Sequence, residues 1–359
     1  MINEEELRGR HDEEKQELRR QLDKKDEILE GYKREKGQLE VFFKRVINHI
    51  EPITPFPSVF EKTKQKPVAE SEVVPVVHIT DSHMGAVQEP DEIEEFNEFN
   101  PEICDNRNVG FTQAAIRWAH LHRNIYKINQ LHVLITGDLI SGDIHDELKI
   151  TNAFPTPVQV HRAAQVHTKQ IALFAPHFER VIVHFLTEDN HSRLTKKPQA
   201  KKAGKNSLNC LVGLLMEAYL EKHNNVEFNI YPQHAKVVSI ADFNYLLMHG
   251  HGIKAWMGIP WYGIERRIAR ESTARQHIIM RDIEQAKEIG FNKVIHGHFH
   301  TPFDSVKFAC GGSVSGTDAF DHQHGRHSDP SQSVWMIHPK HGEFNRTNFN
   351  LKQFDDGET

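Results

Sequence analysis

The spacing of hydrophobic positions changes twice along the chain. In residues 1–50, a charged and proline-free run, apolar side chains recur with a seven-residue period. This period predicts a helix able to form a coiled coil and to join copies of the chain into a homo-oligomer. Lysines occupy other core positions of the same register, so a single solvated helix is an equal alternative. Residues 51–72 contain four prolines with polar spacing and predict a linker.

From residue 73 to residue 345, short β-branched runs alternate with amphipathic segments. The runs predict buried strands at 73–80, 131–136, 180–186, 226–230, 235–248, 293–296, 305–309 and 333–338. Helical periodicity covers 111–129 and 158–178. Such alternation predicts an α/β layered domain with its functional groups at the carboxyl ends of strands. Residues 346–359 are expected to form a polar tail.

Five of the candidate strands end in side chains that can bind a metal ion. One such strand end is commonplace, because Asp, Asn and His also form loops and caps. With 26 histidines in the chain, a single His is weak evidence. Five strand ends in series indicate a common site, formed by Asp81, His83, Asp138, Asn190, His191, His249, His298 and His300.

The mixture of carboxylate, imidazole and amide groups suits Mn, Fe, Zn or Ni ions better than an all-oxygen calcium cage. Two divalent ions about 3.5–4 Å apart need a shared anionic ligand to offset their repulsion. Such a pair lowers the pKa of a bridging water and neutralises charge that grows on a phosphate oxygen. We therefore expect two divalent ions, with Mn²⁺ as the leading candidate and Fe, Zn, Ni or Mg as alternatives.

The ordered motifs resemble those of the calcineurin-like metallophosphoesterases, a family that includes DNA nucleases and many phosphatases. The matching segments are Asp81-Ser82-His83, Gly137-Asp138, Asn190-His191, His249 and Gly297-His298-Phe299-His300. The resemblance implies a four-layer fold, in which two mixed sheets pack together and helices flank them. It also implies that Asp138 bridges two ions. Asp81, His83 and His300 would hold the first ion, and Asn190, His249 and His298 the second.

The third motif departs from the family pattern on both sides of its histidine. By resemblance, His191 would be a general acid or a phosphate contact beside the metals. Asp189 stands where glycine is usual, and Ser192 stands where an acid normally orients the histidine. Another group must then fix the tautomer of His191. Asp189 and Glu188 are the candidates.

Cationic and aromatic side chains near the motifs bear on the substrate. The loop after His191 carries Arg193, Lys196, Lys197, Lys201 and Lys202. Trp256 and Trp261, with nearby arginines, follow His249, and they either stack on bases or pack in the core. Beside a phosphoryl-transfer centre these features favour a nucleic-acid substrate, so a metal-dependent DNA nuclease is the leading prediction. The alternatives are a protein or nucleotide phosphatase and a weakly active interaction protein.

The composition limits the remaining classes. A net charge of −6 argues against a uniformly basic coat for nucleic acid, although local basic patches remain compatible with it. The three cysteines are far apart and form no CxxC pair, which favours a reducing, cytoplasmic compartment. No run approaches the about 18 apolar residues of a membrane span, so no membrane association is expected. His322, His324 and His327, with Asp318 and Asp321, predict a loop that closes over the site rather than a further metal site.

Overall fold

A computed structural model describes residues 46–58, 72–255, 260–280 and 289–357, together with Gly37, Val41 and Lys44. The chain divides into two units, Met1–Ile50 and Glu51–Thr359. Most of the predicted coiled coil lies outside the described residues, so it stays a prediction. In the second unit, residues 51–58 have extended backbone, and Ile53 donates a backbone hydrogen bond to Tyr219. None of the described helices is long and apolar enough to cross a membrane.

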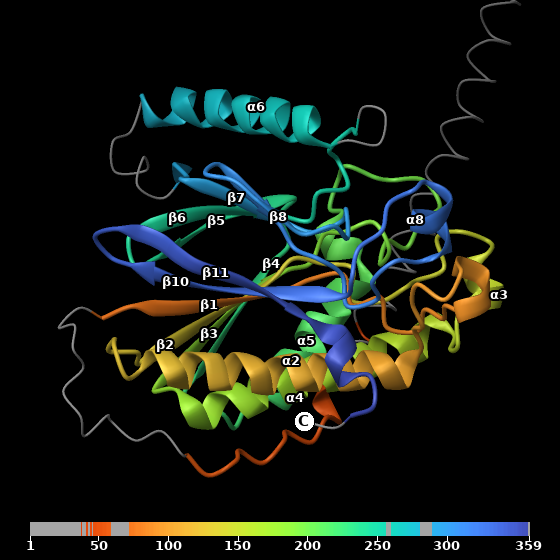
Figure 1. Cartoon of the computed structure of the whole chain (residues 1–359), viewed down its shortest axis with the longest axis horizontal. Helices are drawn as coiled ribbons and strands as arrows, with labels where there is room; N and C mark the ends of the chain where they lie inside the picture. Colours follow the sequence, from red (N-terminus) through yellow and green to blue (C-terminus); the bar gives the residue numbers. More distant parts are fainter. Residues whose placement is uncertain are drawn as a thin grey trace, which may run out of the picture. The chain divides into compact units, whose positions relative to one another are not determined.

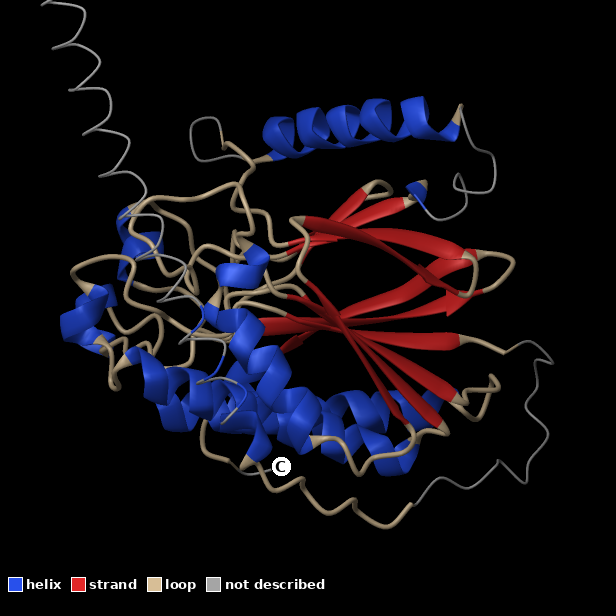
Figure 2. Ribbon diagram, turned by 180° about the vertical axis from the view of Figure 1, so that it is seen from behind, coloured by secondary structure: helices blue, strands red, loops and turns tan. Residues whose placement is uncertain are grey.

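Two sheets form the centre of the second unit (Figures 1 and 2). The six-stranded sheet has the order β11 (Gly342–Asn350), β10 (Ser331–His338), β1 (Val74–Ile79), β2 (Gln130–Ile135), β3 (Arg180–Leu186), β4 (Val226–Tyr231). The five-stranded sheet has the order β5 (Ala235–Ile240), β6 (Phe243–Met248), β7 (Lys293–His296), β9 (Phe308–Cys310), β8 (Phe303–Asp304). Strands β1 to β4 are parallel, as are β6, β7 and β9. Both sheets are therefore mixed, as predicted.

Helices cover the outer faces of the two sheets and complete four layers (Figure 1). The helices beside the six-stranded sheet are α2 (Pro101–His122), α4 (Thr156–Phe174) and α5 (Leu208–Tyr219). Helix α6 (Trp261–Ile279) lies across the five-stranded sheet, where Ile264 packs on Leu246 and Phe308. The shorter helices are α3 (Leu148–Thr151), α8 (Ala319–Gln323), η1 (Pro90–Ile93), η2 (Ala175–His177), η3 (Gly204–Asn206) and η4 (Leu351–Phe354). The predicted four-layer fold is confirmed.

The core between the sheets explains why several strands read as continuous apolar runs. All six residues of β1 are buried, because one face meets the second sheet and the other meets helices. Trp335 of β10 and Tyr245 of β6 meet edge to face, and the indole Nε1 donates to the Tyr245 hydroxyl at 2.8 Å. Large side chains from both sheets thus fix the sheets against each other.

Several predicted boundaries differ from the structure. The predicted strand at 235–248 is two antiparallel strands, β5 and β6, separated by a turn at Ala241 and Asp242. Helix α2 begins ten residues before the predicted 111, because the Asn100 side chain caps it and Pro101 occupies its first turn. Residues 346–357 are not a polar tail: β11 runs through Asn350, and η4 buries Leu351 and Phe354. The buried Arg107 guanidinium donates to Asp355 Oδ1 at 2.6 Å and holds this segment against α2.

Candidate metal centre

The loops after β1 and β2 lie side by side at the carboxyl edge of the larger sheet. Asp81 donates its backbone N–H to the Gly137 carbonyl at 3.0 Å, and His83 donates to the Asp138 carbonyl at 3.0 Å. These two bonds continue the parallel register of the strands beyond their ends. The aspartate of the first motif is therefore held next to the aspartate of the second.

The first ligand group consists of Asp81, His83 and His300. Their donor atoms all lie within 4.8 Å of one another. His83 Nε2 and His300 Nε2 are 3.0 Å apart, and Asp81 Oδ1 lies 3.6 Å from His300 Nε2 and 3.9 Å from His83 Nε2. Two imidazole nitrogens and a carboxylate oxygen so placed can share one cation. The structure thus brings together the three residues assigned to the first ion.

The second ligand group contains Asp138, Asn190, His249 and His298. His249 Nε2 lies 2.9 Å from Asp138 Oδ2 and 2.9 Å from Asn190 Oδ1. The opposite ring nitrogen, Nδ1, donates to the Thr136 carbonyl at 2.9 Å, which leaves the Nε2 lone pair for a metal. His298 completes the group, with its donor atom within 4.8 Å of those of Asp138 and His249.

Further hydrogen bonds orient the metal ligands. Asp81 Oδ2 accepts from Thr80 Oγ1 at 2.6 Å and from the His298 backbone at 3.0 Å. His300 Nδ1 lies 3.1 Å from Asp321 Oδ2, and Asp318 caps the short helix that carries Asp321. A carboxylate behind a ligand histidine fixes its tautomer and raises its basicity. The two aspartates of the 318–327 segment therefore support the first ligand group, a role that the sequence analysis missed.

The backbone at the ligands is strained. Left-handed φ angles occur at Asp81 (51°), His83 (47°), Asp138 (48°), His298 (74°) and His300 (57°). Such angles are uncommon for residues other than glycine and cost on the order of 1–3 kcal/mol each. Five of the predicted ligands share this conformation, which turns their side chains into one pocket. Other residues of the described chain also have left-handed φ angles, but strain shared by five converging donors is typical of a functional site.

The electrostatics of the pocket favour a bound cation. Burial raises the pKa of Asp138, but the nearby His249 and His191 hold it well below the ordinary value. Burial lowers the pKa of His249, yet Asp138 raises it to about 10. Burial and neighbouring imidazoles hold the pKa values of His83 and His298 well below the ordinary value. A dense group of buried carboxylates and imidazoles is a donor set that fits divalent metal.

His191 is oriented by a backbone carbonyl rather than by an acid. Its Nδ1 lies 2.6 Å from the Ser141 carbonyl, and its ring meets the His83 ring edge to face at 4.7 Å. The prediction that Asp189 or Glu188 orients His191 is wrong. Asp189 instead accepts hydrogen bonds from the backbones of Asp138 and Ser192, and Glu188 faces two other histidines. The Ser141 carbonyl, from the loop after β2, thus takes the orienting role that an acid after His191 would have.

The predicted substrate-binding residues have mixed environments. Arg193 donates to the carbonyls of Asn190 and Thr195, so it stabilises its own loop. Lys196 pairs with Asp146 at 3.0 Å, whereas Lys197, Lys201 and Lys202 are exposed. Trp261 is 47% exposed and packs on Phe308 with ring centroids 4.7 Å apart, so it takes part in packing, and its stacking on bases stays a prediction. Trp256 lies outside the described residues.

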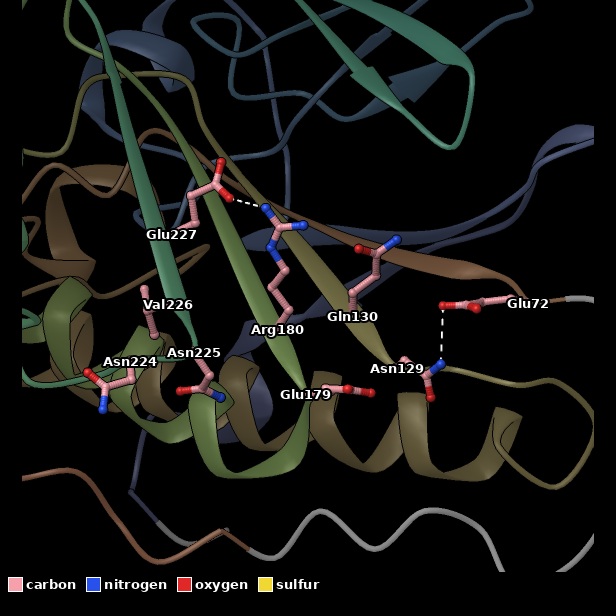
Figure 3. A pocket seen from close by; sticks show the side chains of 9 residues that line it. All are labelled: Glu72, Asn129, Gln130, Glu179, Arg180, Asn224, Asn225, Val226 and Glu227. Atoms are coloured by element: carbon pink, nitrogen blue, oxygen red, sulfur yellow. Dashed lines mark hydrogen bonds and ion pairs between the residues drawn. The ribbon is translucent and has the colours of Figure 1, made fainter.

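Two cavities lie beyond the ligand groups. One of about 680 Å³ follows the His249 loop and is lined by Gly252, Ile253, Lys254, Ala255, Tyr262, Gly263, Arg266, Arg267 and Arg270. Its four cations place a basic surface along the first turns of α6. The other, of about 560 Å³, lies at the opposite edge of the larger sheet (Figure 3). Arg180 there pairs with Glu227 and no ligand group is present among its labelled residues.

Comparisons with known proteins locate relatives only among solved structures. No family model and no curated protein matches the chain. The chain is similar to a predicted phosphoesterase from Streptococcus pneumoniae TIGR4, with 10% identity, 77% of this chain and 97% of that chain covered, and a TM-score of 0.28. It is also similar to Vps29 from Entamoeba histolytica complexed with zinc, with 14% identity, 77% and 99% covered, and a TM-score of 0.27.

A further similar structure is the calcineurin-like phosphoesterase YfkN from Bacillus subtilis, with 8% identity, 79% of this chain and 92% of that chain covered, and a TM-score of 0.32. Two of these three proteins are named as phosphoesterases. Similarity at these TM-scores carries no argument about activity. The functional assignment depends on the ligand groups themselves.

Proposed function

We propose that the chain is a two-metal phosphoesterase of the calcineurin-like kind. One observation carries the proposal: two groups of mixed oxygen and nitrogen donors converge at neighbouring strand ends, on backbone that is strained at five of the ligands. A divalent pair bound there would supply a metal-activated hydroxide and neutralise charge on the phosphate. Asp138, whose loop hydrogen-bonds to the loop of Asp81 and His83, is positioned to belong to both groups.

The protein side chains would divide the remaining work. His191 lies beside His83, and its Nδ1 is engaged by the Ser141 carbonyl, so Nε2 is the ring nitrogen that would meet a substrate oxygen. From that position it would donate a proton to the leaving group or bind a phosphate oxygen. Because Ser141 orients the ring, the absent acid after His191 no longer supports an inactive interaction protein.

The favoured substrate is a phosphodiester of DNA. Lys197, Lys201 and Lys202 are exposed on the loop that begins at His191, and the basic cavity along α6 begins at Gly252, three residues after His249. Cations that follow two of the ligand motifs in the chain suit a polyanion better than a small ester. Tyr262, 69% exposed in that cavity, offers a ring on which a base can stack.

A phosphatase of proteins or nucleotides is the second candidate. Arg193 and Lys196 are engaged by their own loop and by Asp146, which removes two cations from the expected nucleic-acid track. The cations that remain exposed would still suffice to bind the single phosphate of a monoester.

A substrate panel separates the candidates. Purified protein is assayed with Mn²⁺, Mg²⁺, Ni²⁺ and Zn²⁺ on a monoester, a cyclic ester, single- and double-stranded DNA and RNA. The proposal expects metal-dependent hydrolysis, with DNA cleaved. Hydrolysis of monoesters alone would replace the nuclease by the phosphatase, and inactivity on every ester despite bound metal would refute both.

A further inference from the structure

A third group of donors lies next to the candidate centre and belongs to neither ligand group. Glu188, His234 and His251 have donor atoms within 4.8 Å of one another. His234 Nδ1 lies 2.5 Å from Glu188 Oε2, and His251 Nε2 lies 3.4 Å from Glu188 Oε1. The three residues come from loops after β3, β4 and β6, at the same edge of the fold as the two ligand groups.

The Glu188 carboxylate is buried, with 7% of its surface exposed. Its partners in the described part of the chain are the two imidazoles. The neighbouring cation, Arg267, is engaged by Glu271 at 2.6 Å. A buried carboxylate needs a positive charge close by. Either a protonated histidine or a bound cation can supply that charge here.

We propose that Glu188, His234 and His251 bind a third divalent ion. Two histidines and one glutamate form a ligand set that catalytic zinc sites use, with a fourth position left for water or substrate. The His234 side chain is 40% exposed and opens the group to solvent, which gives an ion a path of entry. Glu188 Oε1 and His251 Nε2, 3.4 Å apart, have the spacing of two ligands on a tetrahedral ion.

The third group lies against the second ligand group. The His251 ring centroid is 5.7 Å from that of His249 and 6.4 Å from that of His298. The third group also borders the basic cavity. Gly252, which lines that cavity, lies beside His234 and Arg267: a Cβ atom added at Gly252 would be 3.6 Å from His234 Cε1 and 3.9 Å from Arg267 Nη1. An ion here would contact a phosphate that extends from the centre toward Arg267. That role rests on the proposed phosphoesterase function, but the existence of the site does not.

Metal counting tests the site directly. Metal-free protein is dialysed against Zn²⁺ at a fixed free concentration, and the ions per chain are measured by elemental analysis. His234→Ala and Glu188→Gln are each expected to bind one ion fewer than the unchanged chain. His341→Ala, which removes an exposed histidine in the turn between β10 and β11, is the matched control and is expected to bind the same number.

The same count in an Asp138→Asn background keeps the site separate from the proposed function. Adding His234→Ala to that variant should again remove one ion, whatever the esterase assays show. Equal counts with and without His234→Ala, in both backgrounds, would overturn the third site and would indicate that Glu188 only hydrogen-bonds to its histidines. Inactivity on all esters with the one-ion difference intact would refute the function alone.

Discussion

The two ligand groups and the basic surfaces around them are built in opposite ways. The ligands are buried or partly buried, and five of the seven have left-handed backbone angles. Asp81, for example, is fully buried and accepts hydrogen bonds from Thr80 and His298. The cations of the 196–202 loop and of α6 are mostly exposed, and Lys196 and Arg267 are paired with neighbouring acids. The fold thus fixes the positions of the ligands, whereas the proposed contacts with DNA would come from exposed side chains.

The largest loss of hydrolytic activity is expected when Asp138 is replaced. Asp138→Asn keeps the shape of a side chain that is 1% exposed but removes the charge that both ions would share. The loss of hydrolysis should exceed the about 10²–10³-fold that follows removal of one oxyanion-hole donor. Steady-state rates on a generic ester measure it. Asp143→Asn, at an exposed position of the same loop, is the control, and equal rates for the two variants would contradict the metal assignment.

A smaller loss of metal affinity or activity is expected when a residue that hydrogen-bonds to a ligand is replaced. Asp321→Ala removes the carboxylate at His300 Nδ1, and such partners typically change metal affinity or activity by about 10–100-fold. The apparent metal dissociation constant, from activity against metal concentration, is the measurement. Arg326→Ala removes the other partner of Asp321 and leaves the His300 contact in place, so it should change little. If Asp321→Ala and Arg326→Ala change the metal dissociation constant equally, the Asp321 carboxylate acts only through the packing of its loop.

The lysine loop should affect DNA alone. Replacing Lys197, Lys201 and Lys202 by Gln should weaken DNA binding and reduce the slope of log affinity against log salt by about 0.7–0.9 for each lost phosphate contact. Hydrolysis of a small monoester should stay within about twofold, because a single small phosphate gains little from distant cations. Fluorescence anisotropy at several salt concentrations measures the slope.

The control for the lysine loop is a variant with the same change in charge at three other exposed lysines, Lys169, Lys222 and Lys340. This variant should keep the slope of the unchanged chain. A slope that falls equally in both variants would show that net charge alone, rather than this loop, attracts DNA.

The smallest effect is expected along α6. Arg266→Gln and Arg270→Gln together should lower DNA affinity a few-fold, since exposed cations each contribute about 1 kcal/mol or less. Binding of a short single strand is the readout, with Arg117→Gln and Arg180→Gln, at exposed positions away from α6, as a paired control. No change in affinity would leave the cavity along α6 outside the substrate path.

The sequence predicts the α/β layers and the ligand positions because strand runs and the polar groups that end them are adjacent in the chain. The four-layer arrangement of two sheets comes from the resemblance of the motifs to a known family. It does not reveal the partner of His191, since any residue can offer a carbonyl and Ser141 has no distinguishing side chain in that role. His234 escapes notice because it is a single histidine in the short loop between β4 and β5, with no second ligand type beside it to form a motif. Strand β11 reads as a tail because its edge position leaves it largely polar and only partly buried.

A crystal structure of the protein loaded with Mn²⁺, with anomalous scattering used to locate the ions, would show whether the two ligand groups hold two ions. We expect two peaks on either side of Asp138, about 3.5–4 Å apart. Asp81, His83 and His300 should contact one of them, and Asn190, His249 and His298 the other. A single peak, or peaks away from Asp138, would contradict the two-metal centre.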